Sequence, residues 1–358
     1  MAQTISATDT ELQKPVNAIF QQDFLRNAKA RCPYFMGTQK GEVTEHSGTS
    51  TIKWRRIENL TPTTTALSEL TGTASYMQGR DSVAASFTDV TATVGKYGQF
   101  YILNEEADLF NYNGQTAKLV ETLAISAGRS LNQLQRNVVE DNATVVYANG
   151  GADSAVNTVI AVGDVQNVIN TLDRNSAMTF TPMTTGSTNI GTVPVLPAYW
   201  GLTHPDVAVD ISGLSGFTSV EKYAGQVDTV MGEFGTLSVA GQAVRFVSSE
   251  DASIDTDVGA TGGSGVRETT NSKADLYHTV VYGMDAVGSV GMGEEHTDGI
   301  YRAGDSMDSI ELILKEKGSG GTSDPLNEIS TLGWKSWHSG AILNANWART
   351  IRSAASSL

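Results

Sequence analysis

Alternating apolar and polar residues predict two β-strands in the first third of the chain. In the string TSTIKWRRI, Ile52 and Trp54 share one face, while Lys53 and Arg55 share the other. The string DVTATV, which ends at Val94, repeats this alternation. We therefore expect both segments to form strands that pair as a hairpin.

The polar connection between these strands, residues 61–80, is long. Loops of more than roughly 12–15 residues without secondary structure are uncommon inside domains, so the length of this one indicates a functional role. A two-stranded hairpin alone is marginally stable in water, so we expect a protruding hairpin to pack against another structural element. The pattern leaves a second arrangement open, in which an ordinary hairpin folds back onto its own sheet with a loose tip.

Apolar residues spaced mostly by three, four or seven predict one long amphipathic helix over 114–148. The positions are Leu119, Val120, Leu123, Ala127, Leu131, Leu134, Val138 and Val146. At about 1.5 Å per residue the segment would reach about 52 Å, so we expect an elongated molecule. A kinked pair of helices that breaks at the polar stretch 140–142 is the alternative. A second helix is predicted over 163–177, and a short one within 14–37, closed by Pro33.

Short strand-like runs, punctuated by glycine and proline, follow the helices. They are Met178–Thr181, Thr192–Leu196, Tyr199–Thr203, Val244–Ser248, Tyr277–Tyr282 and Ser309–Leu314. Because helices and strands are interspersed, we expect both in one fold. Polar, glycine-rich stretches at 251–272 and 318–324 are typical of surface loops. Trp334, Trp337 and Trp347 indicate that the C-terminal region packs into a core, either as strands or as a helix.

Composition narrows the class of protein. The chain has 358 residues and a formal net charge of −15, with 40% hydrophobic and 18% charged residues. This balance is that of a folded protein, and the acidic charge disfavours direct recognition of nucleic acid, which needs clustered Lys and Arg. No apolar run approaches the roughly 20 residues that span a bilayer, and the start lacks the pattern of a secretion signal. We expect neither membrane insertion nor signal-dependent secretion.

No motif for catalysis, metal binding or cofactor binding stands out. The single cysteine, Cys32, excludes an intrachain disulfide and a multi-cysteine metal site, and its aromatic neighbours indicate a packed side chain. The five histidines are scattered, and no Gly-x-Ser-x-Gly or lysine-containing phosphate loop occurs. Asp255 and Asp257 lack the rest of a calcium loop, and residues 294–296 make a poor acid–base group. We expect no enzyme activity, no metal and no cofactor.

Seven strings along the chain, taken in order, resemble a known family. They are GKYGQF from Gly95, NEEA from Asn104, YWGLTHPDV from Tyr199, KYAG from Lys222, GEFGTLSVAGQAVRFVSSEDA from Gly232, YGMDAVGSV from Tyr282 and DPLNEISTLGWKSWHSGAILNANWARTIRS from Asp324. The ordered set resembles the major capsid proteins of podoviruses like coliphage N-four, which have the Hong Kong 97-type fold of tailed-phage shells. The resemblance reaches from about Lys14 to Arg352.

This resemblance implies an α+β fold and a division of the chain into five parts. They are an N-terminal arm with a short helix (1–37), an extended β-hairpin loop (49–94), a peripheral domain (95–162) with a spine helix (114–148), an axial domain (163–284) and a return to the peripheral domain (285–358). The resemblance favours strands for the tryptophan-rich C-terminal segment. The protruding hairpin would rest on the neighbouring subunit.

By the same resemblance, the chain would be a shell subunit that assembles with itself into pentamers and hexamers. The icosahedral shell would enclose phage double-stranded DNA without sequence-specific binding, in a virion assembled in the bacterial cytoplasm. Portal, scaffolding and decoration proteins would be further partners. The extended loop would contact the neighbouring subunit through Ile52, Trp54, Arg55, Arg56, Leu67, Leu70, Tyr76 and Arg80. Because the loop tip contains no lysine, we expect no covalent cross-link between subunits.

Two other interpretations stay open. The chain could be a different self-assembling shell or virion subunit, such as an encapsulin-type compartment or a tail component. It could also be a soluble hydrolase with an unrecognised site. Electron microscopy of the purified protein separates these classes, because shells and dispersed particles with turnover look different.

Overall fold

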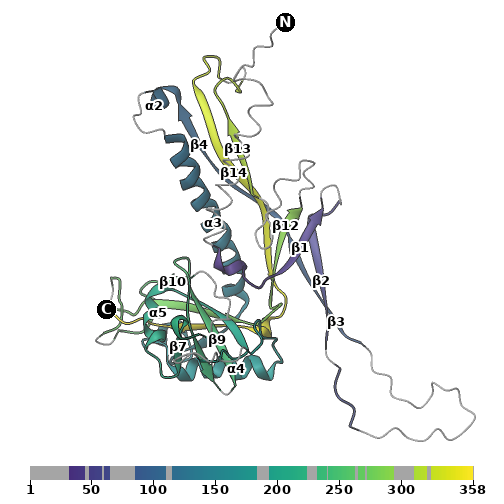
Figure 1. Cartoon of the computed structure of the whole chain (residues 1–358), viewed down its shortest axis with the longest axis vertical. Coiled ribbons are helices and arrows are strands. Elements are labelled where there is room, and N and C mark those ends of the chain that lie inside the picture. The colour runs from purple at the N-terminus through teal and green to yellow at the C-terminus, as the bar shows by residue number, and fades with distance from the viewer. Residues whose placement is uncertain are drawn as a thin grey trace, which may run out of the picture.

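The computed structural model describes residues 32–44, 48–58, 60–64, 85–109, 115–183, 193–223, 232–239, 241–262, 265–270, 272–293, 310–320 and 324–357. Figure 1 shows an elongated molecule with two bodies. In the long body, one helix lies along a sheet; the compact body is built around a second sheet. A two-stranded ribbon leaves the long body and points away from both.

The compact body is organised by an eight-stranded mixed sheet of order β5-β15-β11-β6-β9-β8-β7, with β10 pairing with β11. Its strands are β5 (Thr144–Tyr147), β6 (Ala198–Thr203), β7 (Phe217–Ser219), β8 (Glu233–Val239), β9 (Gln242–Ser248), β10 (Ile254–Asp255), β11 (Leu276–Tyr282) and β15 (Ala348–Ser353). The pairs β5–β15 and β6–β9 are parallel, and the other pairs are antiparallel. Every residue of β6 and of β11 is buried, as expected of strands covered on both faces.

Two helices, α4 (Val162–Arg174) and α5 (Pro205–Ser212), belong to this body. Helix α4 buries one stripe, which consists of Val165, Val168, Ile169 and Leu172, against the sheet. The start of α4 is capped because the Asp164 carboxylate accepts a hydrogen bond from the backbone amide of Ala161 at 2.8 Å. Helix α5 begins with Pro205, and His204 Nδ1 accepts from the amide of Asp206 at 3.2 Å.

The long body pairs helix α3 (Gln115–Asn142) with a five-stranded sheet centred on β14 (Ile329–Ile342). The other strands are β1 (Gln39–Thr44), β4 (Gly95–Asn104), β12 (Val287–Gly293) and β13 (Ile310–Lys315), and the short helix α2 (Glu105–Leu109) follows β4. The core between α3 and the sheet contains Leu123, Leu131, Leu332 and Trp334. In the described ranges, the three-residue 3₁₀ turns are η1 (Pro33–Phe35), η2 (Asp153–Ala155), η3 (Val220–Lys222) and η5 (Ala345–Trp347).

The long helix is confirmed, but its C-terminal end differs from the sequence prediction. Helix α3 has 28 residues, about 42 Å at 1.5 Å each, and ends at Asn142. Residues 144–147 form β5, so Val146 belongs to a strand and not to the helix. The reason is local: the polar stretch before Ala143 ends the apolar stripe, and the β-branched run Thr-Val-Val that follows favours a strand.

The described chain begins at Cys32, and the residues that follow pack against both bodies: Phe35 lies in the core under α3, and Tyr34 packs with Trp200 of the compact body. The Cys32 thiol is buried and donates to the carbonyl of Gly128 in α3 at 3.2 Å, which fits the packed side chain predicted for it. The short helix predicted within 14–37 and closed by Pro33 lies mostly outside the described residues. In the described part, Pro33–Phe35 form turn η1.

Most of the predicted strands are present. Those at 199–203, 244–248, 277–282 and 309–314 correspond to β6, β9, β11 and β13, and the C-terminal segment forms strands. In the described part of Met178–Thr181 and of Thr192–Leu196, by contrast, there are isolated bridges such as Thr181–Ala198 and not strands. No helix in the described ranges is long and apolar enough to span a membrane.

Candidate assembly surfaces

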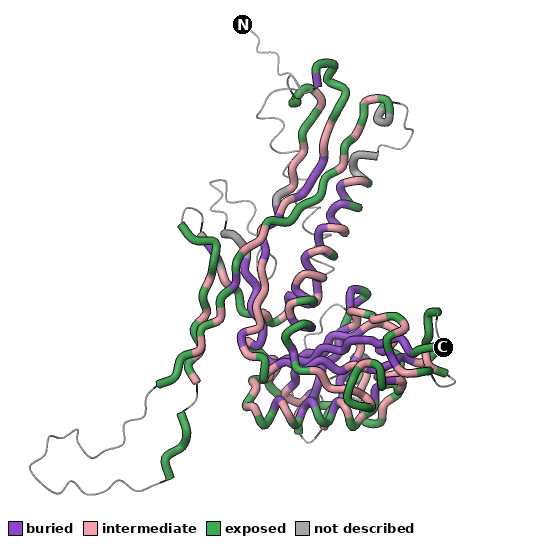
Figure 2. Tube along the Cα trace, turned by 180° about the vertical axis from the view of Figure 1, so that it is seen from behind, coloured by how far each residue is buried: buried purple, intermediate pink, exposed green. Residues whose placement is uncertain are grey.

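The ribbon consists of β2 (Thr51–Ile57) and β3 (Phe87–Thr93), paired antiparallel from Thr51–Thr93 to Ile57–Phe87. Both strands alternate between exposed and half-buried positions, as the sequence pattern predicts. Figure 2 shows that the far end of the ribbon lies apart from both bodies. The far end of the ribbon therefore projects from the molecule.

The near end of the ribbon is anchored on the chain's own sheet. Ile52 and Trp54 pack against a small apolar cluster formed by Val43, Ala92 and Val290. Glycines make room for the indole: a Cβ on Gly288 would lie 3.0 Å from Trp54 Cζ2, and one on Gly41 would lie 2.7 Å from the same atom. Thus Ile52 and Trp54 fix the direction in which the ribbon leaves the body.

Arg56 is the second anchor of the ribbon. Its Nη1 donates to the backbone carbonyl of Leu343 at 3.0 Å, and its Nη2 pairs with Glu58 Oε1 at 2.5 Å. Thr88 donates to the same Glu58 oxygen, and hydrogen bonds from Thr88 and Arg56 lower the pKa of Glu58. Side-chain hydrogen bonds therefore connect the two strands to each other and to the turn after β14.

The opposite face of the ribbon carries an exposed ion cluster. Arg55 binds Asp89 through two bonds, Nε to Oδ1 at 2.8 Å and Nη2 to Oδ2 at 3.1 Å, and Lys53 Nζ reaches Asp89 Oδ2 at 2.5 Å. The hydrogen bonds from Arg55 and then Lys53 hold the pKa of Asp89 well below its usual range. The guanidinium of Arg55 also lies over the Phe87 ring, 5.6 Å from its centroid. This face presents cations on a chain that is acidic overall.

Large apolar side chains are exposed at the far end of the described ribbon. Ile57, Leu60 and Phe87 are 66%, 58% and 54% exposed. Clustered exposed apolar residues are characteristic of surfaces that meet another protein. Of the other residues predicted to make this contact, Leu67, Leu70, Tyr76 and Arg80 lie outside the described residues.

A second exposed apolar surface lies on the long body, on the sheet face opposite α3. Along β4, Tyr101 packs into the core under the helix, while Phe100 and Ile102 point the other way and are 65% and 63% exposed. Phe100 is paired with Gly333 of β14, where a Cβ would lie 2.8 Å from Phe100 Cβ. Ile329, 42% exposed, extends the surface along β14. We call Phe100, Ile102 and Ile329 the outer sheet patch.

Sequence analysis missed the outer sheet patch, although a signal for it exists. In the string FYILN that begins at Phe100, apolar residues occupy successive positions, so both faces of the strand are apolar. Such a strand is expected to be covered on both sides, and α3 covers one. As for chemistry, no group of three or more His, Cys, Asp or Glu residues in the described ranges is arranged to hold a metal ion.

No protein-family model and no curated protein sequence matches the chain. Solved structures do resemble it. In the capsid of Ralstonia phage GP4, a chain with 8% identity and a TM-score of 0.59 aligns with 92% of this chain over 91% of its own length. In the cyanophage Pam1 capsid asymmetric unit, identity is 11% and the TM-score 0.52, with 90% and 89% covered. For the capsid of cyanophage P-SCSP1u, identity is 12% and the TM-score 0.52, with 89% and 86% covered.

These comparisons show the fold. Over nearly its whole length, the chain has the mixed α+β fold of chains in those phage capsids. At such low identities they do not carry the roles of individual residues from one chain to another.

Proposed function

We propose that this chain is the major capsid protein of a tailed phage with the Hong Kong 97-type fold. The observation that carries the proposal is a fold shared with phage capsid chains over about nine-tenths of the sequence, combined with a ribbon that exposes apolar side chains beyond its own body. The chain is then a structural protein of the virion and not an enzyme, and it assembles in the bacterial cytoplasm.

In this proposal the parts of the structure take the roles that the resemblance implies. Residues 49–94 are the extended loop, α3 is the spine helix, the long body is the peripheral domain and the compact body is the axial domain. If each strand is assigned to the domain whose sheet it joins, the last strand, β15, belongs to the axial domain, because it pairs with β5 and β11. Residues 1–37, most of which lie outside the described residues, are proposed to be the N-terminal arm.

The ribbon is proposed to contact the neighbouring subunit. The far end of the ribbon, with the exposed side chains Ile57 and Phe87, projects away from both bodies and supplies the apolar area of the contact. Arg55 supplies a cationic rim around it. Ile52, Trp54 and Arg56 act indirectly, because they set the angle of the ribbon. The outer sheet patch is the surface on which the ribbon of another copy would rest.

Assembly into pentamers and hexamers then depends on overlap between copies and not on covalent bonds. Obligate interfaces typically bury about 2,000 Å² or more in total, and each subunit offers both an exposed ribbon and an exposed sheet face. The net charge of −15 would keep enclosed double-stranded DNA from adhering to the shell. Portal, scaffolding and decoration proteins are the further partners proposed.

The proposal is tested by assembly of the purified chain. We expect a variant lacking residues 68–79, and separately the double variant Ile57→Ser with Phe87→Ser, to stay folded but to form no closed shells in electron micrographs. Met183→Ser is the matched control, because Met183 is also a large exposed apolar residue, 56% exposed, on the compact body. Shells from either ribbon variant would refute the role of the ribbon. Absence of shells from the wild-type chain, with or without scaffolding protein, would refute the capsid function.

A further inference from the structure

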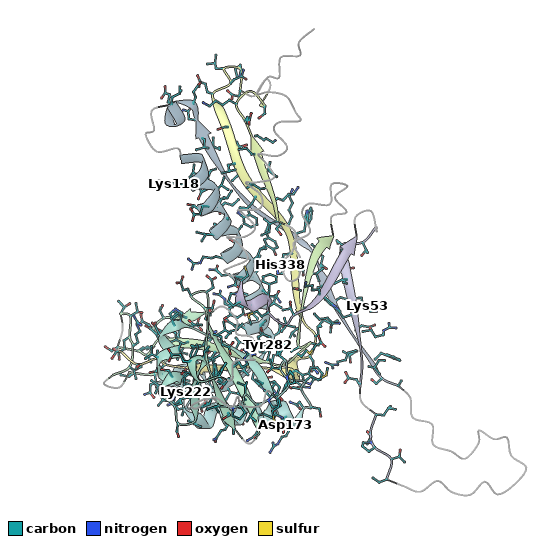
Figure 3. All side chains as sticks on the ribbon, viewed as in Figure 1. Lys53, Lys118, Asp173, Lys222, Tyr282 and His338 are labelled. Carbon is teal, nitrogen blue, oxygen red and sulfur yellow. The ribbon has the colours of Figure 1, made fainter. Side chains whose placement is uncertain are left out.

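The two bodies meet at a polar cluster that is largely buried, with side-chain exposures of 6% for His278 and Glu140 and 40% for Asp255. It joins the C-terminal half of α3, in the long body, to strands β10 and β11 and the loop before β10, in the compact body. Figure 3 shows Tyr282, the last residue of β11, where the compact body meets the lower end of α3, and His338 of β14 farther along the long body. At its centre is His278 of β11, with 6% of its side chain exposed.

Both ring nitrogens of His278 face carboxylate oxygens. Nε2 lies 3.0 Å from Asp255 Oδ2, in β10, and Nδ1 lies 3.4 Å from Glu140 Oε2, in α3. Ionised carboxylates only accept hydrogen bonds, and a neutral imidazole donates from one nitrogen only. Both contacts are therefore hydrogen bonds only when the ring carries two protons, as the imidazolium. In that form His278 links the helix to the sheet.

Glu140 depends on this contact. Its side chain is 6% exposed, and its nearest guanidinium atom, Arg136 Nε, lies at 3.8 Å, beyond hydrogen-bond distance. The other oxygen, Oε1, has no hydrogen-bond partner in the described structure. Nearby, burial and then the Glu140 charge raise the pKa of Tyr34 well above its usual value, so this phenol stays neutral. A buried carboxylate with such weak partners is costly unless a cation faces it.

The surrounding charges leave room for one more cation. Arg129 donates to Asp251 Oδ1 at 2.9 Å, and Arg136 donates to the Asp251 backbone carbonyl. Arg129 and Arg136 thus both contact Asp251, and Arg136 also lies 3.8 Å from Glu140. Asp255, with 40% of its side chain exposed, contacts His278. On the adjacent strand, Arg352 is paired in register with His278, but it is neutralised by its own ion pair with Asp153. The imidazolium of His278 balances the cluster.

We propose that protonation of His278 fastens α3 to the eight-stranded sheet, so that the junction between the two bodies tightens in mild acid and loosens as the pH rises. The sign follows from the geometry. With a neutral ring, one of the two carboxylates faces a nitrogen lone pair, and the contact becomes repulsive.

The junction matters mechanically because α3 belongs to the body that carries the ribbon. If the end of α3 loosens from the compact body, the two bodies no longer keep one fixed angle. This inference concerns the single chain and does not depend on the proposed function. Within that function it would make the shape of the subunit responsive to pH.

The test is hydrogen exchange of the full-length, unassembled chain, followed by mass spectrometry at pH 5.5 and pH 8 after correction for intrinsic exchange. We expect protection of peptides covering residues 136–142 to fall about tenfold between these pH values, which corresponds to about 1.4 kcal/mol. In His278→Gln, which keeps a polar side chain but cannot become a cation, we expect low protection at both pH values. Glu140→Gln removes one carboxylate and should also abolish the pH difference.

His204→Gln is the matched control, because His204 is a partly buried histidine of the same body that lies next to Asp206 and not at the junction. It should keep the wild-type pH difference in residues 136–142. A wild-type chain with equal protection at both pH values would overturn the proposal. So would His278→Gln with the full pH difference, which would reduce His278 to a structural side chain.

Discussion

Removing one partner of the buried ion pair in the compact body should cost far more stability than removing one partner of an exposed pair of the same geometry. Glu233 and Arg245 form two bonds of 2.7 Å each, Nε to Oε1 and Nη2 to Oε2, with side chains 0% and 3% exposed. Tyr223 donates to the same carboxylate at 3.0 Å, and the guanidinium stacks on Trp200 at 4.7 Å from the ring centroid. The ribbon pair of Arg55 and Asp89, described above, supplies the exposed comparison.

The expected magnitude follows from burial. Glu233→Gln leaves the Arg245 charge buried without its counter-ion, and removing one partner of such a pair costs about 3–5 kcal/mol. With an m-value of about 3 kcal/mol/M in urea, the unfolding midpoint should fall by about 1–1.7 M. The double variant Glu233→Gln with Arg245→Met removes both charges and keeps an apolar side chain near Trp200, so it should lose less stability than the single variant.

Urea unfolding of the unassembled chain, followed by tryptophan fluorescence, measures these midpoints. Asp89→Asn is the control: it breaks an ion pair of similar geometry at an exposed site, and its midpoint should match that of the wild type. If Glu233→Gln unfolded at the wild-type midpoint, or if the double variant were less stable than the single one, the reasoning from burial would be refuted.

Three further predictions concern the core, the pH range and the root of the ribbon. Leu131→Ala, at a 0% exposed position on the sheet-facing side of α3, should lower the free energy of unfolding in urea by about 3–5 kcal/mol, and a cost below about 1 kcal/mol would show that the site collapses freely. Burial and then the Asp173 charge raise the pKa of Tyr199 to about 12, above the unfolded value of about 10, so stability should fall as pH rises from 10 to 12. The Tyr199 phenolate absorbance, measured as the difference between the wild type and Tyr199→Phe, should rise together with loss of structure, and a difference signal that rises near pH 10 while the chain is still folded would contradict this. In Gly288→Ala, the added methyl group should displace the Trp54 indole, shift its fluorescence and impair assembly, while the eight-stranded sheet stays folded. Unchanged fluorescence would contradict this packing.

Local periodicity predicted those elements whose partners lie nearby or whose pattern is complete. The stripe through Leu123 and Leu131 has helical spacing, and Trp54 alternates with Lys53, so α3 and β2 could be read directly. Strands β1 and β12 could not. Strand β12 reads VGSVGMG, with glycines in place of an alternating pattern. It pairs in parallel with β1, about 250 residues earlier in the sequence, so that Gln39 is the partner of Gly288.

The candidate site was predictable in part for the same reason. Alternation placed Ile52 and Trp54 on one face of the ribbon, but it could not say which surface they meet. That surface is built from Val43, Ala92 and Val290, of which only Ala92 belongs to the ribbon. The exposure of Phe100 likewise depends on which face of β4 the helix covers, and this is decided by packing across the whole long body.

Strand β15 has a consequence for how the protein is made. It lies between β5 and β11 and is hydrogen-bonded to both, although it follows every other strand in the sequence. A nascent chain that has not been translated through residue 353 leaves β5 and β11 with bare edges, which are prone to pair with other chains. Ribosomes that stop before residue 353 would therefore release aggregation-prone fragments, and this sheet is complete only after β15 has been translated.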